Sequence, residues 1–406
     1  MFYIPALSIH SGISFLAKLA LVLSGGGARG SFQAGALMEL LRYFEENNKR
    51  INILTGTSVG ALNGMCIAQA GSLAAAREEI HYQWKKLRNE DIYQVRGWGI
   101  LSLILKFSTT RMDRWPSVPG VDSLFDNTPL YKRYIEDYLC LEKIRECRTV
   151  DEFQVSICSL STGAAYLKSI TREPDERKVK EYIMASTITT VAYPPVRTVI
   201  EDPELPPHLS NIPQLYADGG ISNKTPLKAI LHAGDISELY VVNTYPSYPN
   251  KTEHSIRATF PNVFSILMRT ALELLPNLYF LRDMQTVRDV NHDLKTLEGI
   301  KKRLLDSAPD EETRYRISEI LESEERKFSF KEGNKHMIDP VIIAPDEELP
   351  VQDTEFVEKK LEETFEMGRR KARSVLLGLK EKDQNGSHEL ATADQDVVYQ
   401  PGSLTG

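Results

Sequence analysis

Short apolar runs of strand length alternate with helix-like segments over the first 250 residues, and this alternation limits the possible folds more than any other feature. The expected strands are residues 20–24, 51–55, 152–160, 164–170, 214–218 and 238–244. Several of these runs are almost continuously apolar, as expected for strands that are covered on both faces. Helices between consecutive strands imply crossover connections. The sequence therefore predicts an α/β fold with a mostly parallel central sheet that is sandwiched by helices.

Beyond residue 255 the pattern becomes mainly helical. Residues 262–275 place apolar side chains on one helical face, and the charged segment at 308–335 is typical of a solvated helix. One last strand is expected at 340–345, followed by an amphipathic helix at 353–379. The apolar positions of that helix are Phe356, Leu361, Phe365, Gly368, Ala372, Val375 and Leu379.

These changes of character divide the chain. The expected parts are an N-terminal extension over 1–18, an α/β domain over 19–250, a mainly helical region over 251–380 packed on that domain, and a disordered tail over 381–406. The poorly patterned connection at 86–135 is interpreted as an insertion or a lid near the functional end of the sheet.

Composition and charge argue against several classes of protein. The net charge of −7 gives no electrostatic reason to expect nucleic-acid binding. The four cysteines are irregularly spaced and form neither a metal-binding nor a disulfide pattern, which favours a reducing compartment and a cytoplasmic location. Residues 1–18 lack the basic start of a signal peptide. The longest apolar run elsewhere, 97–107, is about half of the roughly 20 residues that cross a bilayer, so no transmembrane segment is expected.

The glycines after the first strand allow two interpretations. Gly25, Gly27 and Gly30 spell G-x-G-x-x-G between a strand and a helix, which is the usual dinucleotide-binding signature. The same arrangement can hold another anion, including the oxyanion of an acyl-transfer reaction. A dinucleotide site needs an acidic residue about 20 positions later, at the end of the second strand. That strand ends at Thr55 without an acid, so the cofactor interpretation lacks its specificity residue.

The second strand is followed directly by Gly56-Thr57-Ser58-Val59-Gly60, a G-x-S-x-G that precedes a helix-like segment. In a nucleophile elbow the serine lies on a tight strand-to-helix turn with strained backbone angles. Flanking glycines leave room for the neighbouring backbone and for a substrate, and the helix N-terminus stabilises nearby negative charge. The position of the motif favours Ser58 as a nucleophile.

A serine nucleophile needs a base. The eight histidines occur in no motif that marks one of them as its partner, and His81 is expected to be a surface or packing residue. Asp218 offers a carboxylate instead, because it ends an expected strand in the run Asp218-Gly219-Gly220 at the carboxyl end of the sheet. A plain turn is the structural alternative for this run.

The set G-G-G-A-R-G, G-T-S-V-G and D-G-G, in this order, resembles the patatin-like phospholipase family. Residues 123–139, 184–196 and 216–227 are similar to further segments of the family, and the resemblance covers roughly residues 19–245. It implies a lipid acyl hydrolase with a Ser–Asp dyad and no histidine, on a three-layer α/β/α fold with a helical C-terminal extension. The domain over 19–250 is then the catalytic domain.

Carried onto this chain, the resemblance makes Ser58 the nucleophile and Asp218 the general base. The backbone amides of Gly25, Gly26 and Gly27 form the oxyanion hole. The remaining motif positions are Arg29, Gly30, Gly56, Gly60, Gly219 and Gly220. Arg29 is expected to steady the glycine loop, to attract a phosphate headgroup or to form a structural salt bridge. Family members need no metal, and no cofactor is expected.

The expected activity is cleavage of fatty-acyl ester bonds in phospholipids or lysophospholipids at a membrane or micelle surface. An acyl-thioesterase or neutral-lipid esterase with the same dyad is one alternative, and a nucleotide-binding regulatory protein is another. The sequence does not identify an activating ligand or protein. The apolar run at 98–107 is expected to dip into a lipid interface, to line an acyl pocket or to pack on the sheet, so the chain is expected to be cytoplasmic with peripheral membrane association as one option.

Overall fold

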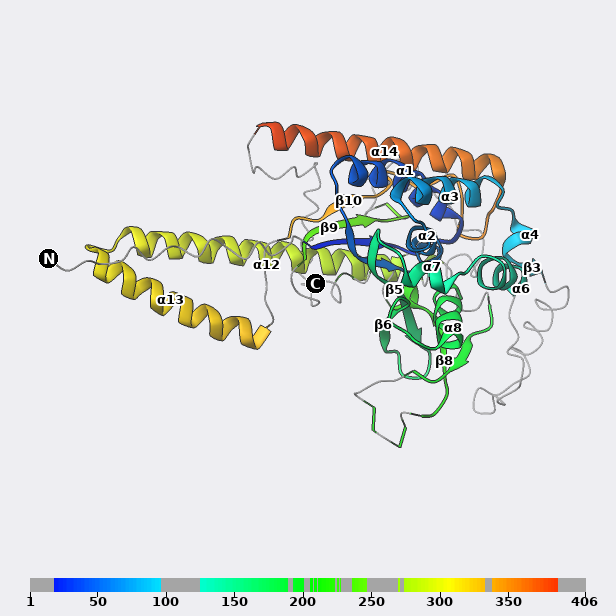
Figure 1. The fold of residues 1–406 in the computed structure, drawn as a ribbon, viewed down its shortest axis with the longest axis horizontal. Helices are drawn as coiled ribbons and strands as arrows, with labels where there is room; N and C mark the ends of the chain where they lie inside the picture. Colours follow the sequence, from blue (N-terminus) through cyan, green and yellow to red (C-terminus); the bar gives the residue numbers. More distant parts are fainter. Residues whose placement is uncertain are drawn as a thin grey trace, which may run out of the picture.

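A mixed β-sheet lies at the centre of the molecule and helices cover it (Figure 1). The computed structural model describes residues 18–95, 125–188, 193–200, 211–222, 236–246, 274–332 and 338–385, with positions 205–206, 208–209, 225, 227 and 269–270.

The main sheet has the strand order β10-β9-β1-β2-β5-β8-β7, and β6 also pairs with β5. Its strands are β1 (Lys18–Leu23), β2 (Ile51–Gly56), β5 (Val150–Ser159), β6 (Ala165–Ser169), β7 (Val196–Thr198), β8 (Gln214–Asp218), β9 (Ile236–Val242) and β10 (Val341–Ile343). All neighbours from β10 to β5 are parallel. β6, β7 and β8 join by antiparallel pairing. The predicted α/β fold with a mostly parallel sheet is confirmed.

Helices connect the parallel strands, as the crossover argument requires. The α-helices of this part are α1 (Gly30–Glu46), α2 (Val59–Ala68), α3 (Leu73–Lys85), α4 (Asn89–Ile92), α6 (Thr128–Leu130), α7 (Leu141–Arg145) and α8 (Glu176–Thr187). Shorter turns are the 3-10 helices η1 (Gly27–Arg29) and η4 (Gly219–Ile221) and the π-helix η3 (Tyr131–Glu136). A small antiparallel ribbon joins β3 (Gln94–Val95) to β4 (Phe125–Asp126).

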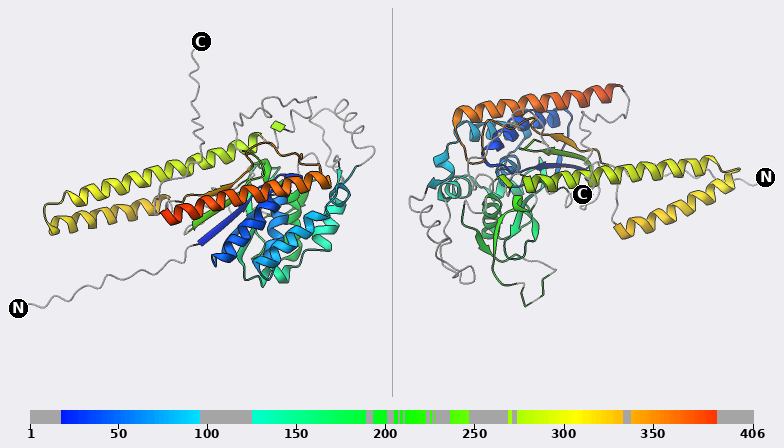
Figure 2. Two further views of the ribbon diagram at one scale, coloured as in Figure 1. Left: turned by 90° about the horizontal axis from the view of Figure 1, so that it is seen from above. Right: turned by 180° about the vertical axis from the view of Figure 1, so that it is seen from behind.

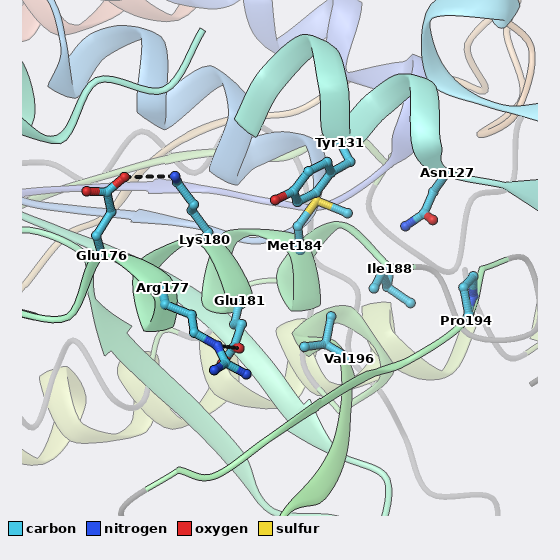
Figure 3. Close-up of a pocket in the computed structure, with 10 residues that line it drawn as sticks. All are labelled: Asn127, Tyr131, Glu176, Arg177, Lys180, Glu181, Met184, Ile188, Pro194 and Val196. Atoms are coloured by element: carbon cyan, nitrogen blue, oxygen red, sulfur yellow. Dashed lines mark hydrogen bonds and ion pairs between the residues drawn. The ribbon is translucent and has the colours of Figure 1, made fainter. Parts of the chain in front are cut away.

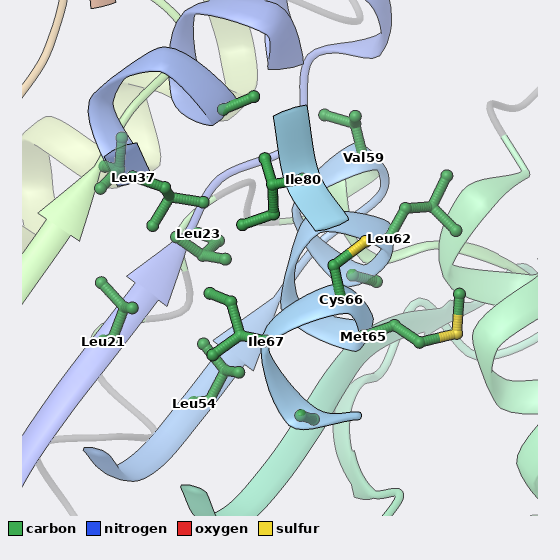
Figure 4. Close-up of a cluster of buried hydrophobic side chains, with 14 of the residues drawn as sticks. Leu21, Leu23, Leu37, Leu54, Val59, Leu62, Met65, Cys66, Ile67 and Ile80 are labelled. Carbon is green, nitrogen blue, oxygen red and sulfur yellow. The ribbon is translucent and has the colours of Figure 1, made fainter. Parts of the chain in front are cut away.

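The residues of β1 alternate between two hydrophobic clusters, because successive side chains of a strand point to opposite faces. Leu21 and Leu23 pack with side chains of α1, α2 and α3 (Figure 4). Ala20 and Val22 pack on the other face with Phe280 and its neighbours. Both faces of the strand are therefore buried, which explains why its sequence is apolar without interruption.

Three long helices follow the sheet: α12 (Leu275–Asp306), α13 (Glu311–Glu332) and α14 (Glu358–Asn385). α14 lies along α1 so closely that a Cβ at Gly35 would be 1.9 Å from the Phe365 carbonyl oxygen. α12 begins against the sheet and is tied there through Asn291, whose amide donates to the Ile338 carbonyl at 2.8 Å. Beyond this point α12 and α13 project from the sheet as a hairpin (Figures 1 and 2), called the arm below.

Several expectations for the C-terminal half are confirmed. The expected strand is β10, and α13 is a solvated helix. The amphipathic helix begins at Glu358 and not at 353, so Phe356 precedes it, but its predicted stripe is turned toward the core, with Leu361, Phe365 and Ala372 buried. α14 continues to Asn385 and so includes the first five residues of the expected tail. The N-terminal extension, the apolar run at 97–107, most of the helix expected at 262–275 and the rest of the tail lie outside the described residues. Among the helices that are described, none combines the length and apolar character needed to cross a bilayer.

Candidate active site

Ser58 lies on the sharp turn between β2 and α2. Its backbone has φ 56° and ψ −126°, a conformation that residues with a side chain rarely adopt. The turn is fixed on both sides, because the amide of Thr57 donates to the Leu23 carbonyl at 3.0 Å and the amide of Gly60 to the Thr57 carbonyl at 2.8 Å. Ser58 is 8% exposed. These are the local features of a nucleophile elbow.

The glycines of the elbow are required by backbone packing. A Cβ at Gly56 would lie 2.4 Å from the Gly60 carbonyl oxygen, and one at Gly60 would lie 2.3 Å from the Leu23 carbonyl oxygen. At Gly30 the obstacle is a methyl group of Val59, at 2.4 Å. Strand β1, the serine turn and the starts of α1 and α2 therefore meet at distances that only glycine permits.

Asp218 ends β8 where this strand meets β5. The pairing of β6 with β5 overlaps the pairings of both β2 and β8, so β2 and β8 lie end to end along the other edge of β5. On that edge Gly56 is opposite Val155 and Asp218 is opposite Ile157. Two residues of strand span roughly 7 Å. β5 thus brings Asp218 close to the turn that holds Ser58.

The end of α8 contacts both residues. The Ser186 hydroxyl accepts a hydrogen bond from the Ser58 amide at 3.2 Å, and the Ile188 carbonyl accepts one from the Asp218 amide at 3.0 Å. The Asp218 carboxylate accepts from the Gly220 amide at 2.7 Å, and the residue is 7% exposed. One three-residue segment thus fixes the serine and the aspartate relative to each other.

The glycine loop, residues 25–27, lies directly against the serine. A Cβ added at Gly25 would be 3.1 Å from the Cβ of Ser58. Gly27 has φ 51°, which favours glycine. The carbonyl of Gly25 accepts a hydrogen bond from the Thr244 hydroxyl. The loop is therefore held beside Ser58 in a conformation that its glycines make possible.

The backbone amides around the loop differ in whether they donate a hydrogen bond. The amide of Ala28 donates to the Asp353 carbonyl at 2.9 Å, and the amide of Arg29 to the Gly26 carbonyl at 3.0 Å. Within the described part of the chain, no hydrogen-bond partner is found for the amides of residues 25–27. Backbone amides in such a turn next to a serine form a suitable anion site.

Buried polar side chains support the loop from behind. Gln33 donates to the carbonyls of Ser24 at 3.2 Å and Val242 at 3.1 Å. Asn63 donates to Gln33 at 2.9 Å, and the indole of Trp84 donates to Asn63 at 2.8 Å. This series of bonds ties the ends of β1 and β9 to α1, α2 and α3. Because all of these residues are buried, the network fixes the loop more firmly than exposed polar contacts would.

Arg29 is buried among carboxylates. Its guanidinium binds Glu348 at 3.0 Å and Asp353 at 2.9 Å, and its side chain is 5% exposed. Tyr245 presents its ring 4.6 Å from the guanidinium carbon. Of the roles expected for Arg29, the structural salt bridge is the one observed. A phosphate that binds Arg29 would have to approach these two carboxylates, which repel it.

A cavity of about 690 Å³ lies beside α8 (Figure 3). It is lined by Asn127, Tyr131, Glu176, Arg177, Lys180, Glu181, Met184, Ile188, Pro194 and Val196. Met184 and Ile188 face the cavity, whereas Ser186, between them, bonds to Ser58. Side chains two residues apart on a helix point in nearly opposite directions. The cavity and the serine therefore lie on opposite sides of the end of α8.

The histidines that the structure describes are peripheral. His81, His208 and His292 are exposed, and His81 makes an edge-on contact with Phe365, with ring centroids 5.5 Å apart. The surface or packing role expected for His81 is confirmed. Within the described ranges, no group of three or more histidine, cysteine, aspartate or glutamate side chains is arranged to hold a metal ion.

The sequence motifs located the serine, the aspartate and the glycine loop, and the structure brings these together. Sequence reasoning missed the contacts made by Ser186, Thr244, Glu348 and Asp353. Ser186 lies in the segment 184–196, so its position was available as a signal. Glu348 and Asp353 occur in no motif, and the only hint of them is that a buried arginine needs carboxylate partners.

A mostly parallel sheet that carries a strained serine turn, with a carboxylate and a glycine loop beside it, is typical of serine-dependent α/β hydrolases. Residues 21–231, more than half of the chain, match the model of the patatin-like phospholipase family, and the protein belongs to this family. Its fold is accordingly a patatin fold, and membership supports a lipid-hydrolysing enzyme.

Among solved structures, the chain is similar to VipD from Legionella pneumophila. The sequences are 12% identical, the TM-score is 0.37, and the match covers 89% of this chain and 67% of VipD. A comparison with curated proteins gives no match.

Proposed function

We propose that the protein cleaves fatty-acyl ester bonds of phospholipids or lysophospholipids, with Ser58 as nucleophile and Asp218 as general base. The observation that carries this proposal is that Asp218 and the end of β2, which leads into the Ser58 turn, lie on one edge of β5, and that the end of α8 bonds to both residues. Family membership supplies the substrate class, lipids.

The reaction begins when the Ser58 hydroxyl attacks the ester carbonyl and gives its proton to Asp218. The carbonyl oxygen becomes an oxyanion, to which the amides of residues 25–27 donate. Collapse of this intermediate breaks the ester bond, and the leaving alcohol takes the proton from Asp218. An acyl-enzyme remains on Ser58.

In the second half of the reaction, water takes the place of the Ser58 hydroxyl as the nucleophile. Water gives a proton to Asp218 and adds to the acyl carbonyl, and the oxyanion again lies against the glycine loop. Collapse releases the fatty acid and returns the proton to Ser58. A carboxylate is a weaker base than histidine, with an ordinary pKa of about 3.9. The arrangement therefore depends on alignment and on oxyanion stabilisation, for which each amide donor is worth about 10²–10³ in turnover.

The test is fatty-acid release from mixed phospholipid vesicles by the wild type, Ser58→Ala and Asp218→Asn. Both variants should lower the rate at least about 10³-fold, because nucleophile and base act as a unit. The matched control is Ser161→Ala, which removes an exposed turn serine and should leave the rate unchanged. Melting temperatures of all variants should stay within a few degrees of the wild type.

The outcomes separate the possible functions. Release that survives Ser58→Ala contradicts the proposal. Ser58-dependent hydrolysis of acyl-thioesters or triacylglycerols at a higher kcat/KM than phospholipids would keep the dyad and change the substrate. A nucleotide that raises the melting temperature, with no serine-dependent hydrolysis, would indicate the regulatory alternative.

A further inference from the structure

We infer that Asp353 and Glu348 are positioning residues for the oxyanion hole, acting on the glycine loop through Arg29 and Ala28. Both lie in residues 346–356, called the strap below, which is outside the region matched by the family model. The inference rests on the proposed function for its catalytic consequence. The contacts themselves are independent of that function.

Asp353 contacts the loop with its backbone and with its side chain. Its carbonyl accepts from the Ala28 amide at 2.9 Å, the first amide after the glycines. A Cβ on Gly27 would lie 2.0 Å from this same carbonyl oxygen, so the strap and the loop are in direct backbone contact. One carboxylate oxygen of Asp353 binds Arg29 Nε, and the other accepts from the Tyr245 hydroxyl.

Tyr245 completes the enclosure of the loop. A Cβ on Gly26 would lie 3.3 Å from its ring, and the guanidinium of Arg29 lies over the same ring. The middle of the loop is thus in contact with an aromatic ring whose own hydroxyl is held by Asp353. Removing the Asp353 charge disturbs two contacts of the loop at once.

Glu348 provides the second anchor of Arg29. It binds Arg29 Nη1 at 3.0 Å and Arg269 Nη2 at 3.3 Å, and its side chain is 9% exposed. A buried guanidinium held by two carboxylates has a fixed orientation, because its donors lie in a rigid plane. Arg29 is the last residue of η1, two residues after Gly27. Because the Arg29 amide donates to the Gly26 carbonyl at 3.0 Å, a fixed Arg29 also restrains the backbone of the loop.

The strap is itself held in place, so it can transmit position. The Tyr93 hydroxyl donates to the Thr354 carbonyl at 2.9 Å, and the Phe356 amide donates to Asn89 at 2.9 Å. Val351 and Phe356 are buried in the main core. The strap joins β10 to α14 and crosses the glycine loop between two fixed ends.

This placement matters because oxyanion donors act only at hydrogen-bond distance. A displacement of about 1 Å at a reacting centre can cost about 10²-fold in rate. Asp353→Asn keeps the size of the side chain and the backbone carbonyl, and it removes the charge that orients Arg29. We expect kcat to fall about 10- to 100-fold with KM changed less than about threefold, because the loop acts on the transition state.

Two control variants distinguish positioning from a general loss of structure. Asp346→Asn removes an exposed carboxylate of the same strap that binds Lys371. Glu39→Gln removes a buried carboxylate that joins α1 to α14 through Arg369 and Arg373, away from the loop. Both should keep kcat within about twofold, and Glu39→Gln should lower the melting temperature at least as much as Asp353→Asn.

The experiment measures kcat, KM and melting temperature with p-nitrophenyl butyrate, and amide hydrogen exchange of a peptide covering residues 24–30. Exchange is measured on the full chain carrying Ser58→Ala, with and without Asp353→Asn, so it needs no activity. Asp353→Asn should speed exchange in this peptide, and Asp346→Asn and Glu39→Gln should not. Glu348→Gln is a second variant with the same expected pattern.

The outcomes test the positioning role of the strap and the proposed function separately. Unchanged exchange in Asp353→Asn and Glu348→Gln, or an equal fall of kcat in Glu39→Gln, overturns the inference. Hydrolysis that does not depend on Ser58 contradicts the proposed function, whereas faster exchange would still support the contact between strap and loop.

Discussion

The helices at the C-terminal end of the chain differ in how they contribute to the structure. α14 lies along α1 over much of its length, and its stripe of apolar residues is buried. The arm exposes its apolar residues instead, with Tyr315 at 70% and Ile320 at 61% exposure. Both belong to the single helical region that the sequence predicts over 251–380, yet only one of them is part of the sheet's covering layer.

Small residues explain the difference. In α14 the stripe contains Gly368 and Ala372 between larger apolar residues, so two helix backbones can approach closely. A Cβ added at Gly368 would lie 1.9 Å from the carbonyl oxygen of Phe32 on α1. In the arm, a Cβ on Gly299 would meet nothing within 4 Å. Gly368 thus marks the close packing of α14 on α1, whereas Gly299 lies on an open surface of the arm.

The largest effect is expected from Gly368→Ala. The added methyl group would meet backbone atoms of α1, so the helices must separate, at a cost of about 3 kcal/mol or more in the free energy of unfolding. Gly378→Ala is the matched control in the same helix, because its Cβ would meet nothing. There the substitution should stabilise by up to about 1 kcal/mol. Urea unfolding measures both, and equal values for the two variants would contradict the close approach of α14 to α1.

A smaller effect is expected from the ion pairs that join α14 to α1. Burial by itself would raise the pKa of the Glu39 carboxyl, but hydrogen bonds from Arg373 and Arg369, with the charge of Arg42, hold the pKa below its ordinary value. A lowered pKa in the folded state stabilises the fold above the unfolded pKa of about 4.3, and this contribution is lost as the pH falls through the folded value.

Glu39→Gln should therefore cost about 1–3 kcal/mol at pH 7, and the difference from the wild type should shrink below about pH 4. An exposed ion pair of the arm serves as the comparison for the buried Glu39. Glu312 pairs with Arg316, and both side chains are more than 70% exposed. Glu312→Gln should change stability by less than about 0.5 kcal/mol at any pH. Chemical unfolding between pH 3 and pH 8 tests both, and a pH-independent difference for Glu39→Gln would contradict the assignment.

The strands and the motif residues were predictable because local sequence determines them. β1 is expected at 20–24 and observed at Lys18–Leu23, since a strand buried on both faces must be continuously apolar. The elbow glycines follow from the backbone contacts of one tight turn. The motifs around Ser58 and Asp218 are a few residues long each, so both residues could be singled out from local sequence alone.

Contacts between distant segments were not predictable. No pattern around Asp353 indicates that its carbonyl binds Ala28, because the bond depends on where β10 ends and α14 begins. The end-to-end meeting of β2 and β8 on β5 likewise depends on antiparallel pairings that periodicity does not specify. The sequence shows that α14 and the arm are helical, but burial is decided by which surface each helix meets.

The smallest effect is expected in the arm, where Gly299→Ala should add up to about 1 kcal/mol of local helix stability. Because the arm beyond Asn291 projects from the sheet, this gain should slow amide exchange in α12 near residue 299 without changing the unfolding midpoint of the sheet. Hydrogen exchange of the variant measures the local stability of α12, and urea unfolding measures the stability of the sheet. If the midpoint rises by the full local gain, the arm and the sheet unfold as one cooperative unit, and the contrast between the arm and α14 holds for packing but not for stability.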